Sequence, residues 1–267
     1  MSSEVRPSRW LVKKAARGGV AALSWASGSL LARRLFARQT RVRALTYHRF
    51  GDLPGDPFCV NPRAFEAQMQ WLSQAGLAFA VAELESFVAG ARELREGSVL
   101  VTIDDGCRSL RDAALPVLLR WRIPAVAFVS AGLIGTAPGA GAAPEAYLGW
   151  EELGELRDAG VAIGSHAFNH RSLARMSVEA ARAEARRSRE LLEQRLGIPV
   201  QSFAYPFGTR ADFGAETEQV LAECGYRSVF HSMHGAIQPG MNPLGLPRVK
   251  IEGGEGLRMF RLACAGA

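Results

Sequence analysis

Cysteine is scarce in this chain and follows no pattern. The four residues, Cys59, Cys107, Cys224 and Cys264, form no Cys-x-x-Cys pair and have no regular spacing. Their scatter gives no sign of a disulfide framework. We therefore expect four reduced, buried thiols.

Lysine is also rare, since 29 of the 32 basic residues are arginine. The basic residues are distributed unevenly along the chain. Residues 1–43 hold ten of them against one acidic residue, a net charge of +9. The other 224 residues therefore carry −3 of the total of +6. A protein that binds nucleic acid is expected to place its basic surface on the working domain. This distribution argues against a nucleic-acid partner.

The sequence lacks a hydrophobic run long enough to span a bilayer. A spanning helix needs about 20 apolar residues, whereas the uncharged stretch Gly18–Ala32 has 15, with basic residues on both sides. Three interpretations of residues 1–42 stay open. They are an interfacial helix that touches an anionic membrane through residues 9–38, a helix docked on the domain or a partner, and a signal peptide or anchor. A retained leader predicts a cytoplasmic or peripheral inner-membrane protein, and a cleaved one a periplasmic or secreted protein.

From residue 43 onward, short apolar runs alternate with helical segments. The expected strands are 43–47, 77–81, 98–103, 125–130, 161–165, 202–205 and 226–230. The expected helices are 62–74, 82–89, 109–120, 150–158, 178–196 and 213–224. Such alternation is typical of a parallel sheet covered by helices. We predict an α/β fold, a distorted (β/α)7 TIM-like barrel over residues 43–267, with residues 1–42 as a basic helical extension.

Functional side chains gather at the ends of the expected strands. Six fall at or just past a carboxyl end: His48, Asp104, Asp105, His166, His170 and Phe207. Barrel enzymes assemble their active sites at that face. One carboxylate and two imidazoles can hold a zinc-like cation and leave positions open for water and substrate. A second, adjacent carboxylate can serve as a base, so the pattern indicates a metal-dependent hydrolase.

Three motifs carry most of these residues: Val-Thr-Ile-Asp-Asp-Gly at 101–106, Ser-His-Ala-Phe-Asn-His at 165–170, and Phe-Ala-Tyr-Pro-Phe-Gly at 203–208. They resemble motifs of the polysaccharide deacetylase family, also called the NodB-homology domain or carbohydrate esterase family 4. The resemblance covers nearly all of residues 44–267. It implies that Asp105, His166 and His170 bind one divalent metal ion, Zn²⁺ first, with Co²⁺, Ni²⁺ or Fe²⁺ as alternatives.

The resemblance also implies roles for the neighbouring residues. Asp104 would be the general base that acts with metal-activated water. Tyr205, Pro206 and Phe207 would line the substrate groove, and the Phe207 amide would donate to the oxyanion, since proline has no N–H.

Three departures from the family's pattern bear on the site. Ala167 replaces a Ser or Thr that steadies the histidine loop, which predicts a less rigid metal site. Phe203 stands where many members have an arginine that orients the base. No Leu-x-His motif occurs near the C-terminus, where many relatives keep the general acid. An amine leaving group needs a proton, so we expect His48 to supply it, with His231 as the alternative.

These observations together predict a hydrolase that removes N-acetyl groups from an N-acetylhexosamine-containing polysaccharide or oligosaccharide. One alternative is a deacylase of a lipid-linked sugar or an O-acetyl glycan esterase. The other is a non-catalytic glycan-binding barrel. A glycan is the expected partner in each case, and the sequence does not fix the oligomeric state.

Overall fold

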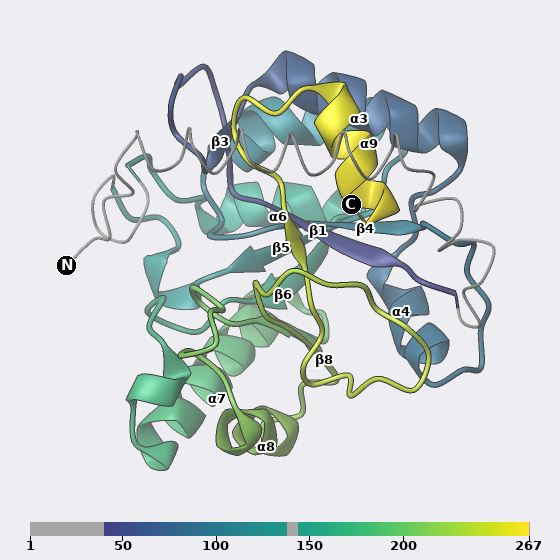
Figure 1. Ribbon diagram of the computed structural model, residues 1–267. Coiled ribbons are helices and arrows are strands. Elements are labelled where there is room, and N and C mark those ends of the chain that lie inside the picture. The colour runs from purple at the N-terminus through teal and green to yellow at the C-terminus, as the bar shows by residue number, and fades with distance from the viewer. Residues whose placement is uncertain (1–39, 138–143, 267) are drawn as a thin grey trace.

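The structure is a computed structural model that describes residues 40–137 and 144–266 (Figure 1). The leader expected at residues 1–42, including the membrane contact expected for residues 9–38, thus lies almost wholly outside the described residues. Within the described part, none of the helices combines the length and hydrophobicity that crossing a membrane requires.

A curled sheet of seven parallel strands forms the centre of the fold (Figure 1). Its strand order is β8-β7-β6-β5-β4-β1-β9. The strands are β1 (Arg43–Tyr47), β4 (Val99–Ile103), β5 (Ala125–Val129), β6 (Ala162–Ser165), β7 (Ser202–Ala204), β8 (Ser228–Phe230) and β9 (Val249–Lys250). Every residue of β1, β4 and β5 is buried, as expected for parallel strands covered on both faces.

The segment 246–250 lies between the two edges of the curled sheet. Leu246 forms a parallel bridge with Phe230 at the end of β8, and β9 pairs with Leu45 and Thr46 of β1. Short contacts of this segment therefore complete the ring, in place of a long closing strand. This arrangement confirms the predicted distorted (β/α)7 barrel.

Helices pack around the sheet. They are α3 (Pro62–Ala75), α4 (Val81–Val88), α5 (Leu115–Trp121), α6 (Trp150–Asp158), α7 (Val178–Leu196), α8 (Ala215–Glu223) and α9 (Leu257–Ala265). The ends of α7 follow directly from the sequence. The Ser177 side chain accepts a hydrogen bond from the Ala180 amide, and Gly197 ends the helix with a φ of 66° that favours glycine.

Several elements differ from the expectation. The strand expected at 77–81 is reduced to one bridge, between Ala78 and Val99, because α4 already begins at Val81. The helix expected from 109 begins with a π-helical turn, Leu110–Ala114. Sequence reasoning missed α9 and three strands of two residues each: β9, β2 (Arg49–Phe50) and β3 (Cys59–Val60). Two residues cannot show the alternation by which strands are recognised. The four cysteines are free and buried, as predicted.

Candidate active site

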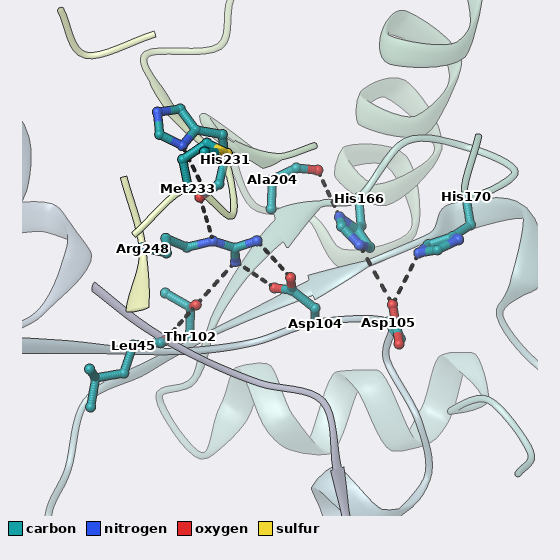
Figure 2. Close-up of polar contacts among 10 residues, drawn as sticks. All are labelled: Leu45, Thr102, Asp104, Asp105, His166, His170, Ala204, His231, Met233 and Arg248. Carbon is teal, nitrogen blue, oxygen red and sulfur yellow. Dashed lines mark hydrogen bonds and ion pairs between the residues drawn. The ribbon is translucent and has the colours of Figure 1, made fainter. Parts of the chain in front are cut away.

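Three potential metal ligands converge at the carboxyl ends of β4 and β6 (Figure 2). The Oδ1 atom of Asp105 lies 3.5 Å from Nε2 of His166 and 3.2 Å from Nε2 of His170. One ligand atom from each side chain lies within 4.8 Å of the other two. Tetrahedral ligands at about 2.0–2.1 Å from a zinc ion are about 3.3 Å apart. The three residues that the sequence selected therefore have the spacing that one such ion requires.

The electrostatics of this cluster also fit a cation. His166 Nδ1 lies 2.7 Å from the carbonyl oxygen of Ala204, which fixes that nitrogen as a donor and leaves Nε2 directed at Asp105. Burial lowers the pKa of His166, but the Asp104 and Asp105 carboxylates outweigh it and raise the pKa overall. Burial raises the pKa of Asp105, but hydrogen bonds with His166 and His170 bring it well below its usual range. Both shifts show that the cluster attracts positive charge.

Backbone strain is concentrated around the same cluster. Of the five described non-glycine residues with positive φ, four lie here: Asp105 at 75°, Ala167 at 62°, His170 at 53° and Phe207 at 63°. Each left-handed residue costs roughly 1 kcal/mol or more, and such costs persist where surrounding structure enforces them. Strain at this point in the fold is a sign of a functional site.

The histidine loop is anchored in a way that its sequence did not reveal. The Glu184 carboxylate, on α7, accepts hydrogen bonds from the Phe168 and Asn169 amides at 2.9 Å and from Asn169 Nδ2 at 2.8 Å. Ser188 Oγ donates to the Ala167 carbonyl oxygen at 3.0 Å. The expectation of a looser loop, drawn from the missing hydroxyl at 167, therefore overlooked the support that α7 gives.

Asp104 faces a different partner from Asp105. Arg248 donates to both of its carboxylate oxygens, from NH1 and NH2, at 2.7 Å each (Figure 2). The two side chains are almost fully buried, with 2% of Asp104 and 1% of Arg248 exposed. The guanidinium is itself held by Thr102 Oγ1 at 3.2 Å and by the His231 carbonyl oxygen at 3.4 Å. Arg248 thus supplies the guanidinium that Phe203 cannot.

This ion pair determines the protonation of Asp104. Burial raises the pKa of the carboxyl, whereas the charges of Arg248 and His166 and the hydrogen bonds from Arg248 lower it, and the net result is a lowered pKa. Asp104 is therefore ionised at neutral pH and able to accept a proton. Sequence reasoning missed Arg248 as its partner. The only signal was a Leu-Pro-Arg stretch at 246–248, 144 positions from Asp104.

His48 lies within the field of both aspartates. Its Nδ1 atom is buried and has no hydrogen-bond partner among the described residues. Its ring packs edge-on against Phe58 at 4.9 Å, and Lys250 Nζ lies 3.5 Å from the centre of the Phe58 ring. Burial lowers the pKa of His48 to about 4, although the Asp105 and Asp104 carboxylates act in the opposite direction. The imidazole is therefore neutral at pH 7 in the absence of substrate.

Of the three predicted groove residues, only Phe207 is exposed. Its side chain is 56% exposed, and its ring lies 5.1 Å from that of His170. Pro206 is buried. Tyr205 was predicted to line the substrate groove, but its side chain is only 1% exposed. The ring packs between Phe203 and Phe213, so it belongs to the core.

His231, the alternative proton donor, also has a packing role. Its ring stacks on Phe213 at 4.4 Å, and its Nδ1 accepts a hydrogen bond from the Met233 amide. Figure 2 shows the His231 ring on the far side of Arg248 from the two aspartates. The backbone carbonyl of His231 contacts Arg248, whereas its ring packs on Phe213 and does not enter the cluster.

Comparison with known proteins agrees with this geometry. A family model described as polysaccharide deacetylase matches residues 91–229, just over half of the chain. The chain belongs to the polysaccharide deacetylase family. The resemblance carried by the three motifs is therefore confirmed.

Individual relatives of this chain are distant in sequence. Bacillus subtilis YxkH, which is named as a polysaccharide deacetylase, is 24% identical over 218 residues, covering 81% of this chain and 74% of its own. The poly-β-1,6-N-acetyl-D-glucosamine N-deacetylase of Staphylococcus aureus strain MRSA252 is 22% identical over 208 residues, covering 73% and 68%.

Solved structures confirm the fold of the deacetylase. Streptococcus pyogenes deacetylase PplD, in complex with acetate, has a TM-score of 0.76 at 21% identity, over 85% of this chain and 99% of its own. IcaB from Ammonifex degensii has a TM-score of 0.72 at 28% identity, over 85% and 98%.

Proposed function

We propose that this polysaccharide deacetylase is a metal-dependent amide hydrolase that removes N-acetyl groups from an N-acetylhexosamine-containing glycan. The observation that carries the proposal is the separation of two adjacent carboxylates. Asp105 faces two imidazoles, whereas Asp104 is ionised and fixed by a buried arginine. The named activity of the staphylococcal relative supports a polymer of N-acetylglucosamine as the kind of substrate.

Asp105, His166 and His170 would hold the ion, and zinc fits this set of donors best. A divalent cation would supply Lewis acidity, which polarises a carbonyl and lowers the pKa of water. Asp104 accepts the proton of the attacking water. The Phe207 amide has no acceptor among the described residues and is available to stabilise the oxyanion.

His48 would give a proton to the departing amine. The neutral imidazole would first take up a proton from solvent, and negative charge developing on the substrate beside Asp104 and Asp105 would favour that uptake. The lack of any other partner for His48 Nδ1 among the described residues supports this role.

The His48→Ala variant tests this assignment through the leaving group. We expect kcat for N-acetyl hydrolysis to fall about a hundredfold, because an amine cannot leave without a proton. Hydrolysis of an aryl acetate should change much less, since a phenolate leaves without help. The measurement is kcat on both substrates. An equal loss of kcat on both substrates would contradict the assignment. The Phe58→Leu variant keeps the imidazole but removes the aromatic ring packed against it, so it separates an effect of ring packing from an effect of proton donation.

Chelation tests the metal directly. Acetate release from an N-acetylglucosamine oligomer should stop after treatment with a chelator and return with Zn²⁺. Metal content should be near one ion per chain and should be lost in His170→Gln but kept in His234→Gln, an exposed histidine outside the cluster. Zinc at about 100 times its Kd should also stabilise the fold by about 2.7 kcal/mol.

Full activity in the metal-free protein would contradict the proposal. Acetate release from acetylated xylan, with none from the N-acetylglucosamine oligomer, would instead indicate an ester substrate. Metal and glycan binding without acetate release would indicate the non-catalytic alternative.

A further inference from the structure

A pocket adjoins the histidine loop, residues 166–170. Its volume is about 320 Å³, and it is formed by that loop, the turn that follows it and the first half of α7. Phe168 and Asn169, which line it, stand in the sequence between the ligands His166 and His170. Arg171, which also lines it, directly follows His170. The pocket and the metal cluster thus share one loop.

The pocket has an apolar floor and a basic rim. Phe168 and Met176 contribute to the floor, and Arg171, Arg175 and Arg187 contribute to the rim. Ligand sites commonly combine a mainly apolar lining with a few convergent polar groups. The guanidinium carbon of Arg187 lies 3.8 Å from the centre of the Phe168 ring. That contact orients the group without using any of its N–H donors.

Two of the three arginines on this rim have no acidic partner among the described residues, and the third has only a long contact. Among the described residues, neither Arg171 nor Arg187 forms an ion pair, and the nearest carboxylate oxygen to Arg175 belongs to Asp212, at 3.9 Å. Glu184 also lines the pocket, but its two oxygens accept the hydrogen bonds that hold the histidine loop. The guanidinium groups of Arg171 and Arg187 therefore remain available to a ligand.

We propose that this pocket binds an anionic substituent of the glycan, a carboxylate or a phosphate, so that the enzyme acts on an acidic polymer. The guanidinium fork matches the geometry of both anions. The apolar floor suits the C–H face of the sugar that carries the anion. Because Arg171 directly follows the ligand His170, an anion held there would place its sugar beside the loop that carries the metal ligands. This proposal names the substrate of the proposed deacetylase and rests on that function.

Titration of the full-length protein with small probes tests the pocket without depending on turnover. The probes are glucuronate, glucose 6-phosphate and neutral glucose, and binding is followed by amide chemical shifts. We expect glucuronate or glucose 6-phosphate to bind at the Phe168–Arg171 amides and glucose not to. Affinity should fall about tenfold in Arg187→Ala. It should also fall as salt is raised, because the rim is exposed.

Arg186→Ala is the matched control, since Arg186 is the exposed neighbour on α7 that does not line the pocket. Equal losses in Arg186→Ala and Arg187→Ala, or equal binding of glucose, would overturn the proposal. The stronger of the two anionic probes identifies the substituent. In kinetics, Arg187→Ala should raise KM about tenfold more on an anionic acetylated glycan than on a neutral one, whereas Arg186→Ala should affect both alike. If the protein releases acetate but binds no anion, the proposed anion-binding pocket is wrong and the deacetylase activity stands. If it binds the anion but releases no acetate, the proposed deacetylase activity is wrong and the anion-binding pocket stands.

Discussion

The Asp104→Asn variant is expected to lose about three orders of magnitude in kcat for acetate release while it keeps its metal. Asparagine has nearly the shape of aspartate but cannot accept the proton of water, and general base catalysis contributes about 10²–10⁴ to such rates. Metal content should be unchanged, because the ligand cluster contains Asp105 and not its neighbour. The measurement is kcat alongside elemental analysis of the same sample.

Asp112→Asn, an exposed aspartate on the segment that follows, is the matched control and should behave as the wild type. Activity above about a tenth of the wild type in Asp104→Asn would assign the base to another group, since one positioned base accounts for at least a hundredfold. Loss of the metal from this variant would show that Asp104 is itself a ligand. Some loss of stability is expected in either case, because Arg248 would face a neutral amide in a buried site.

Arg248→Met should both destabilise the protein and shift its pH dependence. Removing one partner of a buried ion pair costs about 3–5 kcal/mol, because the other charge remains buried without compensation. The pKa of Asp104 is lowered in the native protein, so its contribution to stability is present above the unfolded value of about 3.9 and is lost as pH falls through the folded pKa. Without the guanidinium, burial raises that pKa.

The acid limb of kcat/KM in Arg248→Met should therefore move to higher pH, and part of the activity should return in alkaline buffer. The measurements are the pH profile and urea unfolding. Arg248→Lys keeps the charge but not the two-pronged contact, so it should show a smaller shift and remain folded. An acid limb that stays in place in both variants would show that Arg248 stabilises the barrel without tuning the base.

The sequence predicted the ligand cluster because local patterns determine it. A buried strand ends at Asp104 and Asp105, another ends at His166, and parallel strands bring such ends to one edge. The alternation of side chains along a strand also explains why the two adjacent aspartates face different partners, Arg248 and the histidines.

Other features of the site could not be predicted, because they depend on contacts between distant residues or on which face of a strand a side chain occupies. The barrel strands are buried on both faces, so no alternation of polarity told whether the Tyr205 ring enters the core or the groove. The pairing of Arg248 with Asp104 spans 144 positions and leaves no local signal. Glu184, which supports the histidine loop, likewise has no signal in the sequence that distinguishes it from the other charged residues on a solvated helix face.

The stretch 246–250 that completes the ring of strands also carries the arginine that fixes the base. During synthesis, every presumptive ligand and both aspartates emerge before this stretch does. A chain stopped short of it would contain the whole cation-binding set and still lack an oriented proton acceptor. In the proposed mechanism, a copy that lacks this stretch would keep every ligand of the metal site without the arginine that orients the base.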